Sequence, residues 1–542
     1  MKDKYVVWGT GNITRELLEK YEELEVSFFV DNDESKKGKT FYGKRIWHPI
    51  EVRDWGDVFV IISTVAYKQI ENQLIQYGLK KDIDYALYFE YLEDIGFEGI
   101  EDKIEESIFN IPDEYNKKIL IFNDIALKKE NEKKYFLKMQ KMSDEFEAVF
   151  VIEEIEKKYL DDNHIKGIVR PAALSRVYYS RAKKNCQISD EIKKTVECDK
   201  VLKKAVTNLR LKSPDMQKYY EYALVYYYRE YIYKLLKKIS PKAIFIRNTF
   251  EALNSIVEEV CISLGVEVVH TEMGVITGTL TFDFGGEMGR SYPTLYSKKF
   301  KQLQISEEEI SEAYKIWEYI ATTNMNRKVQ YKLNLEESVI KRIDNKKPTI
   351  LYAGQYDFSS GIQPYDEISQ KFHSPFLKSS LEGAIMLATI AEKNEWNFIY
   401  KPHPAMNLLN ERYDMLPKSV IVAEGIGINY LIELADVTIT ILSQTAYDAL
   451  IRNKPVVMLG YMQLKNKGCT YEAFEEEKVE ESIYMALKNG FTKEQKEAFA
   501  KHIAQVCKYY VYDDEDERTL RYGRKMPKTW DDLKYLKKEM EI

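Results

Sequence analysis

Short apolar runs alternate along the chain with segments in which apolar residues return every three or four positions. Runs of the first kind predict buried strands, and segments of the second kind predict amphipathic helices. Within residues 1–100 we expect strands at 4–8, 26–30 and 58–63 and helices at 13–20 and 70–77. Alternating strands and helices are typical of a parallel sheet, so this region predicts a small Rossmann-like domain.

The same alternation returns in residues 117–330 and again in residues 347–510. The strands of these two series are expected at 119–122, 149–152, 167–169, 243–247 and 266–270, then at 349–353, 396–400, 420–422, 437–441 and 456–459. The connecting segments predict a linker at 100–118, two helices within 188–238, a hinge at 322–346 and a tail with a final helix at 511–542. The predicted fold class is α/β, with a pair of Rossmann-like lobes preceded by the small Rossmann-like domain.

Composition and charge remove several classes of protein. The 80 Lys and Arg are balanced by 87 Asp and Glu, for a formal net charge of −7, which argues against a general nucleic-acid binder. The five cysteines form no C-x-x-C pair, so we expect neither a disulfide framework nor a metal site, and a reducing compartment. The first residues run into a strand without a signal-peptide pattern, and no long apolar run is present. We therefore expect a cytoplasmic protein whose membrane contact, if it has any, is peripheral.

Ligands of open parallel sheets bind at the carboxyl ends of the strands, so the strand ends of the third series carry the candidate chemistry. The first strand is followed by Gly354 and Gln355, where glycine permits a close backbone approach and the amide can hydrogen-bond a sugar or base edge. The fourth strand is followed by Ser443, Gln444 and Thr445 at the start of a helix, where a hydroxyl can cap the helix and free N–H groups can attract an anion. The alternatives are a polar loop and simple helix capping.

The second strand of this series ends in Lys401-Pro402-His403-Pro404. Two prolines fix the backbone around His403, so the turn holds a cationic lysine and an imidazole at the mouth of the sheet. Lysine suits a phosphate oxygen as a point charge, and histidine suits it as a donor or proton shuttle. Function is favoured over the alternative of a rigid turn with a solvated lysine.

These strand ends resemble the capsule polysaccharide biosynthesis family, whose best-known members are bacterial β-Kdo transferases. Leu351 to Ser360 resembles the family's Gly-Gln loop, and Tyr400 to Pro404 resembles its His-Pro motif. The segments 436–443 and 447–456 resemble its Ser…Phe-Glu-Ala-Leu…Arg-Gly-Lys-Pro-Val block, with Tyr-Asp in place of Phe-Glu and Arg-Asn in place of Arg-Gly. In the second series, 270–274 resembles a Glu-x-Gly element and 279–286 the Asp that follows it.

The resemblance implies a GT-B glycosyltransferase that moves a Kdo-like or other sugar from a nucleotide donor, favoured as CMP-linked, to a glycan or glycolipid acceptor. It implies that the donor phosphate lies near Lys401 and His403 and that no other cofactor is required. It also implies a catalytic Asp283, as nucleophile or base, with Glu272 as acid/base or as a group that orients the acceptor. From the residues alone, Asp283 is expected on a glycine-flanked loop facing a cleft, and an ordinary exposed loop carboxylate is an equal alternative for both.

In the first domain, Gly9, Gly11 and Asn12 follow a strand and Asp31 ends the next one, which resembles half of a dinucleotide fingerprint. Thr14 stands where the third glycine would be, so nucleotide binding and a purely structural role both stay open. Three other functions compete with the glycosyltransferase: a CDP-polyol phosphotransferase, an NAD-linked oxidoreductase or sugar-nucleotide epimerase led by this domain, and a non-catalytic scaffold. The missing third glycine argues against the oxidoreductase.

Overall fold

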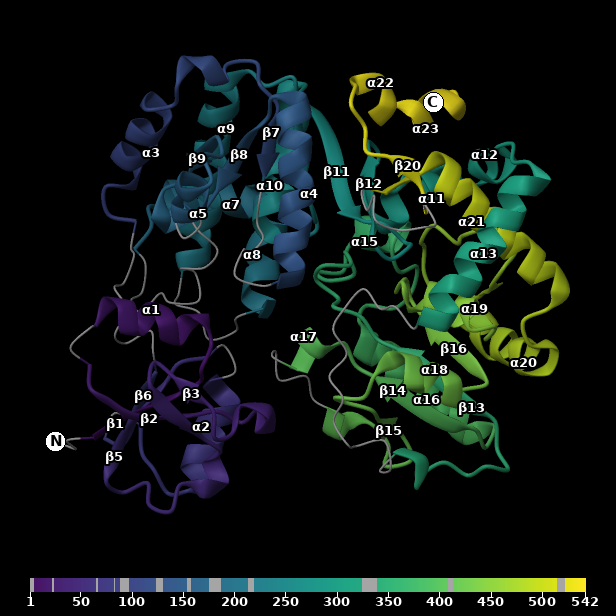
Figure 1. Ribbon diagram of the computed structural model, residues 1–542, viewed down its shortest axis with the longest axis horizontal. Coiled ribbons are helices and arrows are strands. Elements are labelled where there is room, and N and C mark those ends of the chain that lie inside the picture. The colour runs from purple at the N-terminus through teal and green to yellow at the C-terminus, as the bar shows by residue number, and fades with distance from the viewer. Residues whose placement is uncertain are drawn as a thin grey trace. The chain divides into compact units, whose positions relative to one another are not determined.

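The computed structural model describes residues 4–21, 24–64, 67–81, 83–87, 97–122, 130–153, 157–174, 187–212, 219–323, 339–407, 413–513 and 522–542. The chain forms two compact units. The N-terminal unit comprises Met1–Glu98, Ser175–Gln187 and Asp215–Glu221, and the main unit comprises Gly99–Leu174, Ile188–Pro214 and Tyr222–Ile542. Figure 1 shows the ribbon of both units, each of which is described by itself below.

The N-terminal unit is built on one sheet of order β3-β4-β2-β1-β5-β6. Its elements are β1 (Lys4–Trp8), α1 (Asn12–Lys20), β2 (Val26–Val30), β3 (Thr40–Phe41), β4 (Lys44–Trp47), β5 (Val58–Ile62), α2 (Tyr67–Gln76) and β6 (Tyr85–Leu87). All pairs are parallel except β3 with β4. The central strand β1 is apolar on both faces because both are covered, and the Trp8 indole stacks on Trp55 with 5.2 Å between centroids.

The first lobe of the main unit is an eight-stranded sheet of order β20-β19-β12-β11-β10-β7-β8-β9. Its strands are β7 (Leu120–Phe122), β8 (Val149–Ile152), β9 (Gly167–Val169), β10 (Ala243–Ile246), β11 (Glu267–Met273), β12 (Thr279–Asp283), β19 (Val511–Asp513) and β20 (Arg524–Lys525). Its helices include α3 (Ile100–Phe109), α4 (Glu130–Phe146), α5 (Lys157–Asp162), α7 (Asp190–Cys198), α8 (Lys200–Lys212), α9 (Tyr220–Ile239) and α10 (Ala252–Leu264). Strands β7 to β11 are parallel, and β12 runs antiparallel to β11.

The second lobe is a six-stranded parallel sheet of order β15-β14-β13-β16-β17-β18. Its strands are β13 (Thr349–Ala353), β14 (Asn397–Lys401), β15 (Ile421–Val422), β16 (Val437–Thr440), β17 (Val456–Met458) and β18 (Tyr471–Glu472). The helices around it are α12 (Ser297–Gln302), α13 (Glu307–Thr323), α15 (Glu367–Phe372), α16 (Ser380–Lys393), α17 (Pro404–Asn407), α18 (Ile428–Leu434), α19 (Thr445–Ile451), α20 (Val479–Asn489) and α21 (Lys493–Tyr509). This strand order is that of a Rossmann sheet, whose ligands bind where the order reverses, here between β13 and β16. The predicted α/β fold with paired Rossmann-like lobes is confirmed.

The end of the chain belongs to the first lobe and is not a separate tail. After α21, β19 pairs antiparallel with β12, and β20 continues the same sheet. The last helices, α22 (Trp530–Leu533) and α23 (Tyr535–Glu539), follow, and the Trp530 indole stacks on the Phe245 ring of β10 at 6.4 Å. Figure 1 shows the yellow end of the chain beside β11 and β12. The segment 511–542 therefore completes a sheet that began almost 400 residues earlier, at β7.

Three expectations for connecting segments need correction. Residues 100–118 are not a linker, because α3 buries Ile100 and Ile104 one turn apart beneath its charged face. The segment 188–238 holds α7, α8 and most of α9, where two helices were expected. Residues 279–283 form β12, which was not predicted as a strand. Most of the expected hinge at 322–346 lies outside the described residues.

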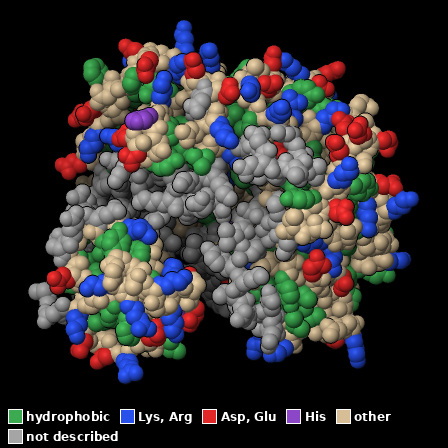
Figure 2. Space-filling model, viewed as in Figure 1, with side chains coloured by type: hydrophobic (Ala, Val, Ile, Leu, Met, Phe, Trp, Pro, Cys, Tyr) green, Lys and Arg blue, Asp and Glu red, His purple; other side chains and the backbone are tan. Residues whose placement is uncertain are grey.

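The described surface carries interspersed charges, as the near balance of acidic and basic residues predicts, and Figure 2 shows both signs side by side on one face. None of the helices in the described part of the chain has the length and apolar character needed to cross a bilayer.

Candidate functional site

The second lobe's reversal point is bridged by Gln355, immediately beyond β13. Its side-chain oxygen accepts the backbone N–H of Leu442, beyond β16, at 3.1 Å. The side chain is only 5 % exposed, and its amide nitrogen has no hydrogen-bond partner among the residues that the structure describes. A buried amide donor without a partner is costly, so this nitrogen is a natural point for a ligand acceptor atom.

The Gly354 backbone lies against the end of β14. Its N–H donates to the carbonyl of Lys401 at 3.0 Å, and a Cβ at this position would lie 3.1 Å from the Tyr400 ring. A side chain here would therefore push the Gln355 loop away from the neighbouring strand end. The sequence expectation that this glycine permits a close backbone approach agrees with this packing, although the approach is to the protein's own strand.

The Lys401-Pro402-His403-Pro404 turn sits where the sequence placed it. Lys401 is the last residue of β14, and Pro404 is the first residue of α17. Burial lowers the pKa of the Lys401 ammonium, and nearby Glu424 opposes that shift. The His403 imidazole lies nearly parallel to the Tyr356 ring, with 5.9 Å between centroids. The turn thus joins the β14 end to the loop that carries Gln355.

The third strand end, after β16, is held by hydroxyl contacts. The Ser443 hydroxyl donates to Thr445 Oγ1 at 3.1 Å and accepts the Thr445 backbone N–H at 3.3 Å. The Ser443 hydroxyl thus accepts the backbone N–H of the first residue of α19, while Gln444 at the N-cap makes no side-chain capping hydrogen bond. The Gln444 side-chain oxygen is buried and has no partner within the described part of the chain. The structure thus brings the three sequence-predicted strand ends to one edge of one sheet.

Asp283 is not a loop carboxylate facing a cleft, and that expectation is wrong. It is the last residue of β12, stands opposite His270 in the ladder and is 2 % exposed. One oxygen accepts the Gly285 N–H and the other accepts the Tyr292 N–H, both at 2.8 Å. Burial raises the pKa of Asp283 to about 7, although these hydrogen bonds oppose the shift. Its carboxylate therefore shapes the turn that follows β12.

That turn carries Glu287, which the sequence reading missed. Glu287 is 3 % exposed, one of its oxygens accepts the Asn248 N–H just beyond β10, and the other has no partner among the described residues. Burial raises the pKa of Glu287 well above its ordinary value, and the negative charge of Glu272 adds to the shift. Glu272, the other predicted carboxylate, lies on β11 with one oxygen 3.8 Å from Arg247.

An ion-pair cluster of Arg290, Glu258 and His270 stabilises the turn that carries Glu287. Arg290 donates to both oxygens of Glu258, at 3.0 and 2.7 Å, in the bidentate geometry that fixes a guanidinium firmly. The His270 imidazole lies 3.3 Å from the same carboxylate, and burial lowers its pKa to about 4. The cluster holds the Gly285 to Arg290 turn in place and thereby positions Glu287.

Loops of both lobes meet beside these residues, and we call this junction the lobe seam. The Phe250 ring, after β10, packs edge-on against the His373 imidazole at 4.6 Å, and the Ser359 hydroxyl donates to Glu251 at 2.8 Å. A Cβ on Gly289 would collide with the carbonyl of Phe372, so the turn that carries Glu287 lies directly against the second lobe. The Gln355 loop and the Glu287 turn are therefore parts of one seam.

Single buried residues at the seam carried no sequence signal. His373 is 1 % exposed, neither ring nitrogen has a partner in the described ranges, and burial lowers its pKa to about 3. Glu287 and Arg290 lie just beyond the motif predicted at 279–286 and belong to no motif of their own. Within the described residues, no group of three or more His, Cys, Asp and Glu side chains is arranged to hold a metal ion.

The glycine turn of the N-terminal unit is shaped by its own backbone. Gly9 has a φ of +115°, and a Cβ there would lie 2.5 Å from the Ser63 carbonyl oxygen. Gly11 has open space around it, so no contact within the protein requires glycine there, and the side chain of Asn12 lies outside the described residues. The Thr14 hydroxyl donates to the Gly9 carbonyl at 2.8 Å, which gives this residue a structural role in the turn.

Asp31 is already engaged inside the same unit. One oxygen accepts the Thr10 N–H and hydroxyl and the Lys36 ammonium, and the other accepts the Asp33 N–H. Burial alone would raise the pKa of Asp31, but the hydrogen bonds from these neighbours outweigh it and lower the pKa below the ordinary 3.8. A carboxylate with a lowered pKa stabilises the fold above its unfolded-state pKa, and that stability is lost as the pH falls through the folded-state value.

We therefore expect Asp31→Asn to destabilise the N-terminal unit at pH 7 by about 1–3 kcal/mol and to reduce the loss of stability on acidification below about pH 4. Hydrogen exchange of the β1 amides in the full chain, followed from pH 3 to pH 7, measures both effects. Asp57→Asn, at an exposed position of the same unit, serves as the control. An unchanged acid response in Asp31→Asn would contradict the role assigned to this carboxylate.

Two family models match parts of the chain. Residues 1–83 match a model described as C2185-like, N-terminal, which falls within the N-terminal unit. Residues 296–506 match a model described as capsule polysaccharide biosynthesis protein. This part of the chain belongs to the capsule polysaccharide biosynthesis family. The family predicted from the strand-end blocks is thereby confirmed, and the capsule biosynthesis region contains Gln355, Lys401, His403 and Ser443.

No curated protein matches the chain. Among solved structures, two of KpsC from Thermosulfurimonas dismutans are similar to it. The β-Kdo 2,7 transferase has 20% identity, covers 51% of this chain and 80% of its own, and gives a TM-score of 0.33. The β-Kdo 2,4 transferase has 15% identity, covers 49% and 80%, and gives 0.34. Anabaena HepE in complex with UDP has 10% identity, covers 72% and 94%, and gives 0.29. The family assignment rests on the match of the capsule biosynthesis region.

Proposed function

We propose that this protein is a glycosyltransferase of capsule-type polysaccharide synthesis that binds a nucleotide-sugar donor on the second lobe and performs the transfer at the lobe seam. The observation that carries the proposal is that each lobe contributes to the seam one buried group without a hydrogen-bond partner among the described residues. The Gln355 amide nitrogen lies at the reversal point of the second lobe, and a Glu287 oxygen lies on the first-lobe turn packed against that lobe. A donor in a doubly wound sheet binds at such a reversal point.

In this proposal the donor phosphate contacts Lys401 and His403. A partly buried ammonium gains most from an anion, because the charge that burial destabilises is then paired. The Gln355 nitrogen donates to an acceptor atom of the sugar or the base. A CMP-linked sugar is the first donor to test, because the strand-end blocks resemble those of the β-Kdo transferases. Assays with different sugars and acceptors would then identify both substrates.

We assign proton transfer to Glu287. Transfer of a sugar to a hydroxyl group forms one bond to the anomeric carbon, breaks the bond to the nucleotide phosphate, which keeps the electron pair, and releases one proton from the hydroxyl. A carboxylate with a raised pKa is a better acceptor for that proton than an ordinary one. Glu272 lies beside it and orients the acceptor, whereas Asp283 is a positioning residue that holds the turn through two backbone N–H groups.

Incubation of the full chain with CMP-Kdo and with a panel of CMP- and UDP-linked sugars tests the proposal. We expect nucleotide release that depends on an acceptor glycan, and a rise in melting temperature with the matching nucleotide. A product that contains the donor's phosphorus would assign a CDP-polyol phosphotransferase instead. No nucleotide release, no transfer and no thermal shift with any member of the panel would rule out the glycosyltransferase.

A further inference from the structure

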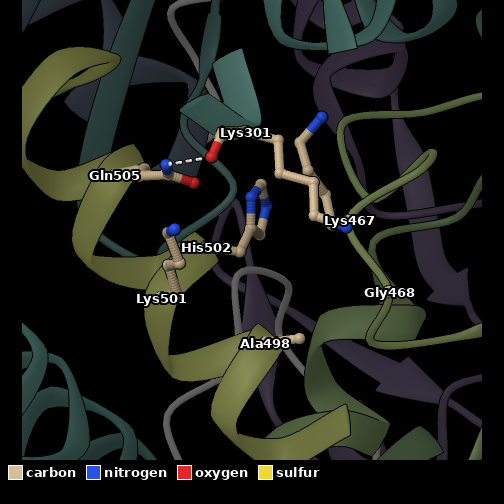
Figure 3. Close-up of a pocket in the computed structure, with 7 residues that line it drawn as sticks. All are labelled: Lys301, Lys467, Gly468, Ala498, Lys501, His502 and Gln505. Carbon is tan, nitrogen blue, oxygen red and sulfur yellow. Dashed lines mark hydrogen bonds between the residues drawn. The ribbon is translucent and has the colours of Figure 1, made fainter. Parts of the chain in front are cut away.

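A small cavity lies away from the seam, between α12, the loop at 465–468 and α21. Its volume is about 190 Å³. The residues that line it are Lys301, Lys467, Gly468, Ala498, Lys501, His502 and Gln505. Figure 3 shows the residues that line it, with the His502 ring projecting from α21 toward Lys301. Three lysines and a histidine line this cavity, and no carboxylate is among its lining residues.

The His502 imidazole is a buried group that the fold leaves half satisfied. It is 1 % exposed, and its Nε2 shares a hydrogen bond of 2.8 Å with the Tyr447 hydroxyl. Its Nδ1 has no partner among the described residues. When the tyrosine donates to Nε2, Nδ1 carries the ring proton and is a buried donor without a partner in the described part of the chain.

Lys467 places a buried amino group in the wall. It is 2 % exposed, and its ammonium donates to the carbonyls of Pro293 at 2.8 Å and Lys465 at 3.1 Å. Two carbonyls satisfy two of its three N–H groups. Burial, together with the neighbouring Lys301 and Lys465 charges, lowers the pKa of Lys467 to about 7 against the opposing effects of Cys469 and Glu472. An anion in the cavity would stabilise the charged form.

The remaining wall is held in a fixed shape. The Gln505 amide donates to the carbonyls of Lys301 at 3.0 Å and Leu303 at 2.9 Å, which fastens α12 to α21. Gly468 has a φ of +83°, and a Cβ there would lie 3.5 Å from the Lys301 ammonium, so a larger side chain would narrow the space. Hydrogen bonds thus hold both the Lys467 loop and the contact between α12 and α21 in place. The cavity is therefore built into the fold and does not depend on exposed lysines alone.

We propose that this cavity is a binding site for a tetrahedral oxyanion of the phosphate class. Its volume of about 190 Å³ is enough for one phosphate group. Lys301 and Lys501 supply charge at the rim, Lys467 supplies charge in the wall and His502 donates from its Nδ1. The phosphate comes from free inorganic phosphate or from the phosphomonoester headgroup of a membrane lipid. The site shares no residue with the proposed donor site, so the phosphate proposal does not depend on the proposed function.

Titration of the full chain with sodium phosphate at constant ionic strength, followed by calorimetry, tests the proposal. We expect saturable binding that chloride does not reproduce. Lys301→Gln with Lys501→Gln is expected to weaken binding by at least about tenfold, since a hydrogen bond to a charged group contributes about 1.5–3 kcal/mol. The matched control is Lys493→Gln with Lys496→Gln, which removes two lysines from the same region of α21 but not from the cavity. Lys401→Gln is expected to leave this binding intact, which separates it from phosphate bound at the donor site.

Ala498→Glu provides a second variant, which adds a negative charge to the cavity where the double variant removes positive charges. Its carboxylate would enter the cavity and pair with the lysines, so we expect a higher melting temperature without phosphate and no response to phosphate. Vesicles containing phosphatidic acid distinguish the sources, because capture by them that free phosphate displaces and Lys301→Gln/Lys501→Gln abolishes assigns a lipid headgroup. Absence of saturable phosphate binding, or full binding by that double variant, would overturn the proposal.

Discussion

Replacing Glu287 with Gln is expected to lower the rate of sugar transfer by about 100- to 1,000-fold while changing nucleotide affinity by less than about twofold. The amide keeps the shape of the side chain and its contact with the Asn248 N–H, but it cannot take the proton of the acceptor hydroxyl. Measurement of kcat and KM for the donor, together with nucleotide binding by calorimetry, separates the chemical effect from binding. Glu101→Gln, at an exposed position on α3, is the matched control.

The pH profile gives the Glu287 prediction a second readout. A base must be ionised to act, and the pKa of Glu287 is raised, so the wild-type rate should fall as the pH is lowered through that raised value. Glu287→Gln should lose this acidic limb. Asp283→Asn is the critical comparison: if it stops transfer at full folding while Glu287→Gln keeps nearly wild-type kcat, the first-lobe catalyst is Asp283, as the motif resemblance implies.

The second lobe could be predicted well because its signals are local. Each strand is an apolar run, and the candidate residues lie at its carboxyl end, as Lys401 does, or just beyond it, as Gln355 does. The order of strands in the sheet brings these ends together, and that order is a regular property of doubly wound folds. The positions of the candidate residues in this lobe could therefore be predicted from the strand ends in the sequence.

The first lobe resisted prediction because its decisive contacts are distant along the chain. Strand β19 has only three residues and is a strand because it pairs with β12, which lies more than 200 residues earlier. The alternation in Thr279 to Asp283 was a strand pattern, but reading the segment as a motif placed Asp283 on a loop. Once β12 is a strand, Asp283 faces the backbone of the next turn and Glu287 becomes the buried carboxylate with an unsatisfied oxygen.

Lys401→Gln is expected to raise the dissociation constant for the donor nucleotide by about 10- to 100-fold, because it removes a charge-assisted contact with phosphate of about 1.5–3 kcal/mol. Stability should change little, since burial already disfavours the ammonium and Gln retains most of the side-chain packing. Because the pKa of Lys401 is lowered, the direction in which donor affinity changes with pH is a further test. Donor affinity should weaken as the pH rises through that value, because only the ammonium attracts phosphate, and the variant should lack this dependence.

Lys393→Gln, which removes an exposed lysine from α16 in the same lobe, controls for the loss of one charge. His403→Ala should weaken donor binding in the same direction as Lys401→Gln, because both side chains lie on one turn at the end of β14. Together with Glu287→Gln, these variants divide the seam into a side that holds the leaving group and a side that moves the proton. A loss of turnover in Lys401→Gln or His403→Ala with unchanged nucleotide affinity would show that the turn acts in the transfer step itself and would contradict this division.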